Sequence, residues 1–237
     1  VENSPTGNID INNKNVQIAD SQLDGTLDAD DAGGSVSVSD TTFSDFTDTG
    51  TNVQFTYDGE NTKVLTDGDA LDGVTFEDYD RVVLMAGTYD SAGMTTTVGD
   101  ADTTITSAPA LDADDVTISA DEGVDVIEAT ANNVAINDVT VEASGAASAV
   151  VATGVSGTEL TNNVLTGGDT IVTTDDNTAV IANNEFDAAG ATVYVDDDGD
   201  LDLQQIIDDN TFTPSALEDE DANQVAPNTE FTVENID

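Results

Sequence analysis

The densest group of potential metal ligands in this sequence is an aspartate run near residue 200. Asp196, Asp198, Asp200 and Asp202 place carboxylates at alternating positions around Gly199. Hard oxygen ligands in a glycine-containing loop suit Ca²⁺, although this glycine does not fall at the turn position of an EF-hand loop. We therefore expect either a Ca²⁺ site at these four aspartates, with no cofactor required for folding, or a solvated acidic loop surrounded by diffuse Na⁺ or K⁺.

Paired carboxylates could also hydrolyse a glycosidic bond, which needs one protonated and one ionised group. The chain has 50 acidic residues, so close pairs arise by density alone and the sequence selects no catalytic residue. Sugar sites usually add aromatic platforms, but the chain has no Trp and only Tyr57, Tyr79, Tyr89 and Tyr194. Tyr79 and Tyr89 bracket an apolar strand and are predicted to pack inside the protein.

The charge balance is extreme, because 50 acids face only three basic residues and the net charge is −47. Asp outnumbers Glu by 38 to 12, and short carboxylates keep a surface hydrated in concentrated salt. At ~1 M salt the Debye length is about 3 Å, so the mutual repulsion is screened. The composition resembles that of haloarchaeal proteins and predicts a halophilic protein. No patch of positive charge exists to bind nucleic acid or anionic lipid.

Missing residue types, the lack of a membrane span and the first residue bear on the cellular location. Cys and His are absent, which excludes disulfides, thiol nucleophiles and the usual zinc ligands. No apolar run reaches the ~20 residues of a membrane span, and none of the 19 Asn begins a glycosylation sequon, so we expect neither membrane insertion nor N-glycans. The first residue is Val1 rather than Met, which we interpret as a processed protein that is extracellular or attached to the cell surface.

Six windows share one pattern, in which an apolar residue is followed by Asp or Asn two positions later and by an apolar residue five positions later. Most successive windows start about 20 to 26 residues apart, and such a period with strand-type residues predicts a solenoid. One longer gap, from Val38 to Ile136, we attribute to four or five degenerate copies. At ~22 residues per turn the chain would form about ten turns. The windows are Ile18-Asp20-Leu23, Val38-Asp40-Phe43, Ile136-Asp138-Val141, Leu160-Asn162-Leu165, Ile181-Asn183-Phe186 and Ile207-Asp209-Phe212.

The Asp or Asn of each window is predicted to lie at a corner between strands, where it can adopt a left-handed conformation. Corners of successive turns should stack ~4.8 Å apart. Asn162 and Asn183 would then form a ladder of shared hydrogen bonds between Asp138 and Asp209. A second strand should follow about seven residues after the window, as from Leu165 to Val172.

Several segments carry a family likeness. The runs DRVVLMAGTYD from Asp80 and DADDVTIS from Asp112 resemble the opening turns of right-handed parallel β-helices of the pectate-lyase-like type. NNVAINDVTV from Asn132, ELTNNVLTG from Glu159 and VIANNEFDAAGATVYV from Val180 look like later turns, and the resemblance covers roughly residues 64 to 212. It implies an all-β, right-handed parallel β-helix with turns of ~20 to 26 residues. The same fold hosts lyases, hydrolases, adhesins and phage spikes, so it does not determine function.

β-Helix lyases that act on anionic polysaccharides resemble one another in using basic residues to accept a proton and to neutralise the uronate. This chain offers only Lys14, Lys63 and Arg81, which lie far apart in the sequence. A lyase is therefore not expected. Asp78 and Asp80 precede Arg81 in the sequence, and an apolar run follows it. Arg81 is therefore predicted to be a structural ion-pair partner.

The likeness divides the chain near the turn signal YDGEN at Tyr57. Residues 1–60 are predicted to form an N-terminal β module or extra turns, in place of the capping helix with which such domains often begin. Residues 61–237 are predicted to form the β-helix, with one short helix from Thr213 and a terminal strand within NTEFTVENID from Asn228.

These features predict a structural role rather than an enzyme. We expect an extracellular protein of a halophile that assembles with copies of itself into a fibre, filament, layer or appendage. Strand-like patterns reach both ends of the chain, and a strand added to a neighbour's open edge would join copies head to tail. Two alternatives stay open: a secreted polysaccharide hydrolase, and a glycan-binding adhesin or viral spike, which would need an exposed Tyr cluster.

Overall fold

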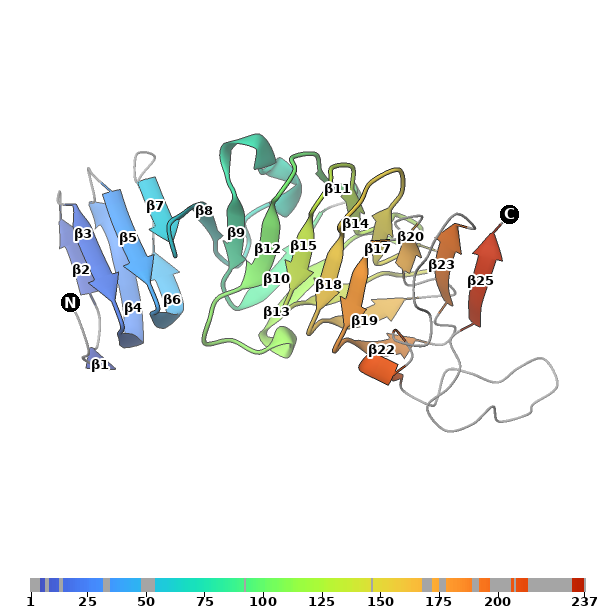
Figure 1. Ribbon diagram of the computed structural model, residues 1–237. Helices are drawn as coiled ribbons and strands as arrows, with labels where there is room; N and C mark the ends of the chain where they lie inside the picture. The colour runs from blue at the N-terminus through green and yellow to red at the C-terminus, as the bar shows by residue number, and fades with distance from the viewer. Residues whose placement is uncertain are drawn as a thin grey trace.

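The computed structural model describes residues 5–6, 9–12, 15–31, 35–47, 54–91, 93–145, 147–167, 172–174, 178–188, 192–196, 206, 208–212 and 232–236. Within these ranges the chain is nearly all β and forms a parallel β-solenoid of about seven turns. The solenoid is elongated along its stacking axis and the two termini lie at opposite ends (Figure 1). The parallel β-helix expected from the sequence is confirmed, whereas the expected ten turns are too many.

Residues before the turn at Asp58 form a two-layer stack, here called the N-terminal unit. Its first layer comprises β3 (Val16–Ala19), β5 (Ser35–Ser39) and β7 (Gln54–Tyr57). Its second layer comprises β1 (Pro5–Thr6), β2 (Ile9–Asn12), β4 (Gln22–Asp31) and β6 (Thr42–Thr47). All strand pairs within this unit are parallel, and Val16 pairs with Val36 of the next turn.

Alternation of apolar and small polar residues explains these strands. In β5 the side chains of Val36 and Val38 are fully buried while the three serines between and around them stay partly exposed. The chain then turns at Asp40, whose φ of 44° is left-handed, as is that of Asp20 one turn earlier. The predicted corners of the first two windows are therefore correct.

After the turn at Asp58 the chain forms a three-sheet solenoid. The first sheet continues the first layer of the N-terminal unit, so that nine strands form one sheet, here called the shared sheet. The added strands are β8 (Glu60–Leu65), β9 (Arg81–Leu84), β12 (Thr104–Ser107), β15 (Ala135–Asn137), β18 (Glu159–Thr161) and β21 (Val180–Ala182).

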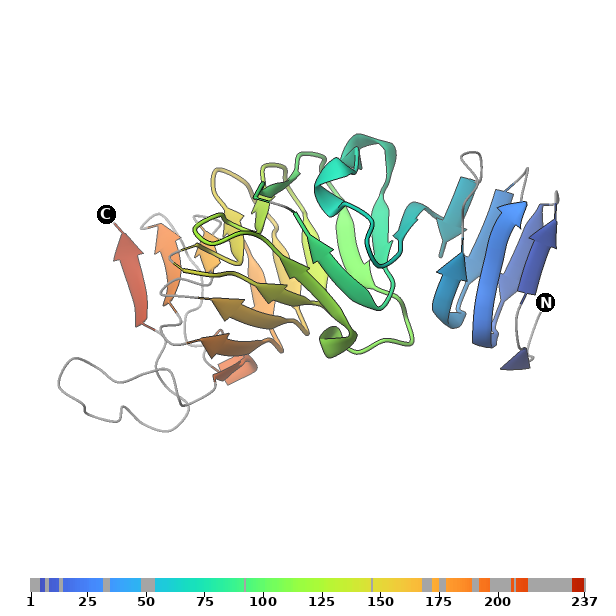
Figure 2. The ribbon, with the colours of Figure 1, turned by 180° about the vertical axis from the view of Figure 1, so that it is seen from behind.

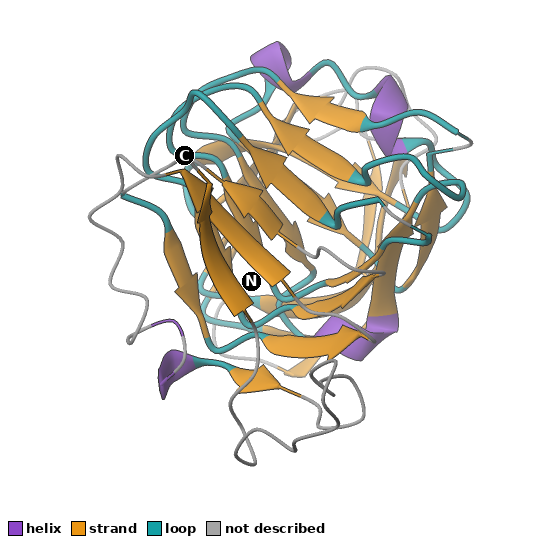
Figure 3. Cartoon of the chain, turned by 90° about the vertical axis from the view of Figure 1, so that its right-hand side faces the viewer, coloured by secondary structure: helices purple, strands orange, loops and turns teal. Residues whose placement is uncertain are grey.

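The other two sheets contribute six strands each, and together the three sheets enclose one apolar core (Figure 3). The second sheet faces the viewer in Figure 2 and contains β10 (Gly87–Asp90), β13 (Val116–Ser119), β16 (Thr140–Glu142), β19 (Val164–Gly167), β22 (Glu185–Ala188) and β24 (Thr211–Phe212). The third contains β11 (Thr96–Val98), β14 (Ile127–Ala129), β17 (Val150–Ala152), β20 (Val172–Thr174), β23 (Thr192–Asp196) and β25 (Thr232–Ile236).

The repeat pattern predicts most corners of this solenoid correctly. Asp138, Asn162 and Asn183 have φ values of 58°, 57° and 57°, and the strand expected at Val172 is β20. The corner expected at Asp209 is wrong, because Ile206, Asp208 and Asp209 lie in a short helical turn. The terminal strand is β25, whereas the helix expected from Thr213 lies outside the described residues.

Turn length varies more than the pattern suggests, which lowers the number of turns. Glu159 pairs with Val180, but Thr104 pairs with Ala135 after a considerably longer stretch of chain. The long gap between the second and third windows contains four strands of the shared sheet, namely β7, β8, β9 and β12. β7 and β8 are the two arms of one hairpin and run in opposite directions, so these strands are not four copies of one 20- to 26-residue period.

The reversal occurs at a hairpin, here called the junction hairpin. β7 and β8 are antiparallel, and Asp58 and Gly59 between them have φ values of 51° and 89°. Two consecutive left-handed residues are the requirement of the tight hairpin turn that Asp-Gly favours. The strands of the shared sheet after the turn therefore run opposite to those before it.

The shared sheet also changes its apolar face at this hairpin. Leu65, Val82 and Leu84 are buried in the larger core cluster, which fills the three-sheet solenoid. Val83, which alternates with them in β9, is buried in the smaller core cluster together with Phe55 and Tyr57 of the N-terminal unit. Neighbouring residues of a strand point to opposite faces, so the two cores lie on opposite sides of one sheet.

Three 3-10 helices complete the described structure: η1 (Leu71–Gly73), η2 (Phe76–Asp78) and η3 (Ala113–Asp115). Leu71 and Phe76 are buried in the larger core cluster. Their helices η1 and η2 lie between β8 and β9, before the second and third sheets begin. They therefore cover the first turn of the three-sheet core and take the place of the capping helix that the sequence lacks.

Candidate functional site

The aspartates proposed as Ca²⁺ ligands lie almost entirely outside the described residues. Asp196 ends β23, and Asp198, Asp200 and Asp202 belong to the part of the chain that is not described. Among the residues that are described, no group of three or more carboxylates could hold a metal ion. The Ca²⁺ site remains a sequence prediction.

Another acidic group, at Asp67 and Asp69, has a structural role. Asp69 Oδ2 accepts hydrogen bonds from the backbone N–H of Thr66 at 2.7 Å and from the Thr66 hydroxyl at 3.0 Å. Asp67 Oδ1 accepts one from the backbone N–H of Thr88 at 3.0 Å, one turn further along. These carboxylates stabilise turns by accepting backbone hydrogen bonds.

Arg81 lies where the junction hairpin meets the three-sheet solenoid. Its Nε donates to Glu60 Oε2 at 2.6 Å, and its guanidinium carbon lies 5.4 Å from the centre of the Tyr57 ring. The expected ion-pair role is confirmed, but the partner is Glu60 rather than Asp78 or Asp80. Register explains the choice, because Glu60 pairs with Tyr57 and Thr62 pairs with Arg81, which places all three side chains on one face.

A cleft of about 330 Å³ opens beside Arg81 over the outer face of β9 and β12. Tyr57, Asp58, Arg81 and Asp138 are among the residues that line it. Burial raises the pKa of the Asp138 carboxyl, although a hydrogen bond from the Asn162 side chain opposes this shift. One protonatable carboxyl and a second carboxylate in the same cleft are the minimum that glycoside hydrolysis requires.

A second cleft, of about 560 Å³, is bounded by β8 and by the loop that carries η1 and η2. Lys63, Asp69 and Asp78 line it together with Phe46 and Tyr79. It combines a cation, carboxylates and aromatic rings. The sequence did not indicate this grouping, because its members are drawn from β6, β8 and the loop that follows β8.

The tyrosines give little support to a carbohydrate platform. Tyr89 is fully buried and its hydroxyl donates toward the carbonyls of Leu65 and Met85, each at 2.9 Å. Tyr57 is 8% exposed, and burial is the main cause that raises its pKa, with Asp58 adding to it. Of the tyrosines described with side chains, only Tyr79 is partly exposed. The expected packing role is thus confirmed for Tyr89 and not for Tyr79.

A ladder of asparagines does run along the solenoid, but one residue beyond the predicted positions. Asn163 and Asn184 are each 1% exposed, whereas Asn162 and Asn183 are exposed. The backbone N–H of Asn163 donates to Asn184 Oδ1 at 2.9 Å, and that of Asn184 donates to Asn210 Oδ1 at 2.8 Å. The ladder is internal and stabilising, so it offers no group to a ligand.

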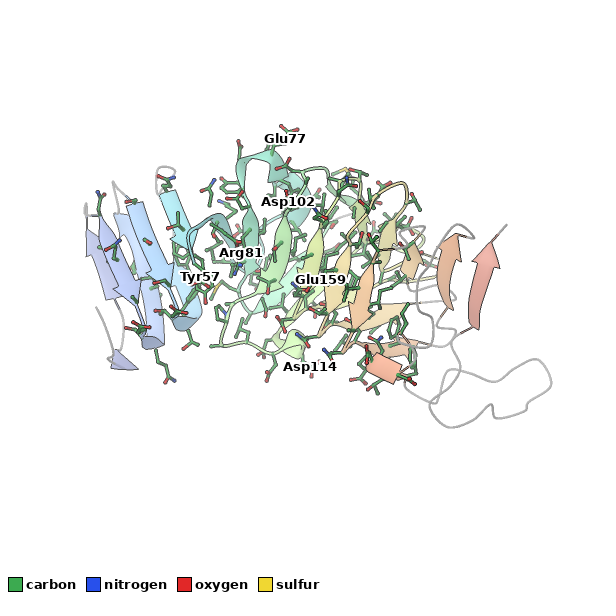
Figure 4. The ribbon with its side chains drawn as sticks, in the orientation of Figure 1. Tyr57, Glu77, Arg81, Asp102, Asp114 and Glu159 are labelled. Carbon is green, nitrogen blue, oxygen red and sulfur yellow. The ribbon has the colours of Figure 1, made fainter. Side chains whose placement is uncertain are left out.

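Acidic side chains cover the outside of the solenoid on several sides, as the positions of Glu77, Asp102, Asp114 and Glu159 show (Figure 4). Along the paired strands these acids are not stacked on one another. Glu159, for example, pairs with Ala135 on one side and Val180 on the other. In the described pairings only Asp10 and Asp28 place two acids in register, which limits the repulsion between directly adjacent like charges.

The two ends of the solenoid differ in construction. At the N-terminal end the last strands are β3 and, in the second layer, β1 and β2, and within the described chain β3 pairs only with β5. At the C-terminal end β24 and β25 are the last strands of their sheets among the described residues. Beside β21 the backbone N–H of Asn183 donates to the carbonyl of Asp209 in the helical turn at 2.7 Å. Strand edges therefore end the stack at both extremities.

Comparisons with known proteins find no family model, no curated protein and no solved structure that matches this chain. Across the described residues no helix has the length and apolar character needed to span a membrane. Functional inference therefore starts from the geometry and charge of the molecule itself.

Proposed function

We propose that this protein is an extracellular structural subunit of a halophile that assembles with copies of itself through the strand edges at the ends of its solenoid. The proposal rests on the difference between the sides of the solenoid and its two ends. The sides carry outward acidic residues on several faces, whereas each end is formed by the last described strands of its sheets, β3 at one end and β24 and β25 at the other. Main-chain hydrogen bonds at such edges join copies without apolar side chains.

The spacing of the acids supports adaptation to concentrated salt. Within the described strand pairs only Asp10 and Asp28 lie in register, so the other strand acids of one column are at least two strands apart, or about 9 to 10 Å. This is close to the Debye length at 0.1 M salt and about three times that at 1 M. Repulsion along the stack is therefore appreciable in dilute buffer and small in brine.

Light scattering and electron microscopy of the full-length chain in molar KCl test this function. We expect particles larger than a monomer, and deletion of residues 1–14, which removes β1 and β2, should leave a folded monomer. Deletion of residues 1–4 alone is the matched control, since it retains both strands, and it should leave assembly unchanged. A full-length chain that stays monomeric at high concentration in brine contradicts the proposal.

A second candidate function, hydrolysis of a polysaccharide, is favoured by the cleft that Asp58 shares with Asp138, whose pKa is raised. In that case Asp138 is the acid and Asp58 the base or nucleophile. Release of reducing sugar from a panel of polysaccharides in molar salt, lost in Asp138→Asn, would establish it. If no polysaccharide in the panel releases reducing sugar, the hydrolase function is refuted and only the structural role remains.

A further inference from the structure

We infer that the cleft of about 560 Å³ beside β8 binds a small zwitterion of the amino-acid class, which carries a carboxylate, an ammonium group and an apolar side chain. β8 lies between β7 and β9 (Figure 1), so the cleft belongs to a single chain and its ligand is independent of the proposed self-assembly. The volume falls within the range of about 300 to 1,000 Å³ that is common for small-molecule sites. Charge, main-chain groups and apolar lining each support this class of ligand.

The cleft contains charges of both signs that are not paired with each other. Lys63, Asp69 and Asp78 all line it. Between described residues the structure has one ion pair, that of Arg81 with Glu60, so the Lys63 ammonium is not paired with either aspartate. It is left to bind the carboxylate of a ligand, and Asp78 is left to bind an ammonium group, in charge-assisted hydrogen bonds.

The edge of β8 adds a main-chain donor and a main-chain acceptor. The N–H of Met85 donates to the carbonyl of Leu65 at 2.9 Å, so Leu65 turns its main-chain groups toward β9. In a parallel pair every second residue bonds to the neighbouring strand, and the main-chain groups of Val64 therefore point away from β9. β7 pairs only with Glu60 and Asn61 of β8 among the described residues, none of which pairs with Val64 on this edge. Val64 also lines the cleft, so its N–H and carbonyl are open to a ligand.

The next residue on the same edge, Thr66, shows what satisfies such a pair of groups. Its N–H donates to Asp69 Oδ2 at 2.7 Å, and its carbonyl accepts from the N–H of Asp69 at 2.9 Å. One residue that offers both a carboxylate and an N–H donor thus binds both main-chain groups of Thr66. An amino acid offers the same combination to Val64, with its carboxylate for the N–H and its ammonium group for the carbonyl.

Apolar and aromatic side chains complete the lining. Leu65 and Phe46 border the cleft from the larger and the smaller core cluster, respectively. Val74 and Tyr79 border it from the loop that carries η1 and η2, and both are half-buried. A ligand with a branched aliphatic side chain would cover this apolar surface, so we expect leucine to bind more tightly than glycine.

Three matched ligands test the site on the full-length chain in molar KCl. Leucine carries both charges, isocaproate is leucine without the ammonium group, and isoamylamine is leucine without the carboxylate. Isothermal titration calorimetry should detect leucine, with binding at least about tenfold weaker for each analogue, because each loses the hydrogen bonds of one charged group.

Variants assign the two charges of the ligand to the two sides of the cleft. Lys63→Gln should weaken leucine about tenfold and leave isoamylamine unchanged, since that amine has no carboxylate for Lys63 to bind. Asp78→Asn should weaken leucine and leave isocaproate unchanged. Thr117→Glu is the matched control for Lys63→Gln, because it lowers the net charge by the same amount on β13, where Thr117 pairs with the uncharged Thr88 and Thr140. It should leave leucine binding unchanged.

The outcomes separate this site from the proposed self-assembly. No leucine binding by the full-length chain, equal binding of the three ligands, or an equal loss in Lys63→Gln and Thr117→Glu would each overturn the inference and leave the self-assembly intact. Should circular dichroism show that Lys63→Gln does not fold, Lys63→Arg replaces it. The arginine variant retains the charge and should still discriminate leucine from isoamylamine, and loss of that discrimination in the folded protein would contradict the site.

Discussion

Replacing Asn184 with Asp is expected to destabilise the protein far more than the same change at its neighbour Asn183. The Asn184 side chain is 1% exposed. Its Oδ1 accepts from the Asn163 backbone at 2.9 Å, and its Nδ2 donates to the carbonyl of Leu160 at 2.8 Å and to Asn210 Oδ1 at 2.9 Å. An aspartate keeps the first bond and replaces both donations by contacts between oxygen atoms.

The size of the effect follows from these contacts. Each lost hydrogen bond contributes about 1 kcal/mol, and each buried acceptor left without a donor costs about 1 to 3 kcal/mol. Two hydrogen bonds are lost, but of the two acceptors the Leu160 carbonyl alone loses its donor here, because Asn210 Oδ1 still accepts from the Asn184 backbone N–H at 2.8 Å. The sum is about 3 to 5 kcal/mol, against a total stability of about 5 to 15 kcal/mol for a folded domain. Asn183 is exposed with φ of 57°, a conformation that Asp138 already adopts at 58°. Asn183→Asp should therefore change stability by less than about 0.5 kcal/mol.

Urea unfolding followed by circular dichroism in molar KCl at neutral pH measures the difference. Both variants add one negative charge, so the comparison removes the general effect of charge. Acidification should restore stability to Asn184→Asp, because the buried carboxyl has a raised pKa in the folded state and stability is lost as pH rises through that pKa. Equal unfolding midpoints for the two variants would refute the assignment of the ladder.

Three other predictions concern salt, the core and a titrating group. The β-type circular dichroism signal should persist in molar KCl and fade on dialysis to low salt without divalent ions, and structure retained in dilute buffer would contradict the halophile argument. Phe186→Asp should lower the free energy of unfolding in urea by several kcal/mol, because the ring is 1% exposed and stacks on Phe212 with ring centres 4.9 Å apart. Glu185 is exposed, so Glu185→Lys should be nearly neutral. Similar losses of stability in the two variants would refute the assignment of Phe186 as inward and Glu185 as outward. Because burial raises the pKa of Asp138, its ionisation opposes folding and stability should fall as pH rises from about 4 toward neutral; Asp138→Asn should flatten this part of the pH profile, and an unchanged profile would refute the assignment.

The sequence predicts the corners of the solenoid well and the ladder less well, for a local reason. An Asp or Asn before a strand marks a left-handed corner at Asp20 and Asp138, but not at Asp209, which lies in a helical turn. At Asn162 and Asn183 a second Asn follows, and spacing alone cannot tell which of two adjacent amides points inward. The residue that corresponds to Asn163 one turn earlier is Val139, which is fully buried. An apolar residue at this position indicates that the second Asn of each pair, and not the first, points inward.

The junction hairpin could be located but not interpreted from the sequence. Asp58 and Gly59 indicate a tight turn, and both have the left-handed φ that such a turn requires. The turn reverses the strands and moves the core to the other face of the sheet. This outcome depends on the pairing of β8 with β9, and β9 lies beyond the loop that carries η1 and η2. Such long-range pairing leaves no periodic signal within either strand. The clefts beside Arg81 and Lys63 arise from the same arrangement and were missed for the same reason.

The junction hairpin also determines how the molecule responds to mechanical tension. Force along the stacking axis runs across the strands, so it separates neighbouring strands one hydrogen bond at a time. β7 and β8 are joined by two residue pairs, Thr56 with Asn61 and Tyr57 with Glu60, whereas β8 and β9 are joined by four. Apolar packing reinforces this short joint, because Val83, Met85 and Ala108 from beyond the hairpin share the smaller core cluster with Phe55 and Tyr57. We therefore expect tension that opens the hairpin also to pull the smaller core apart, while the larger core stays closed.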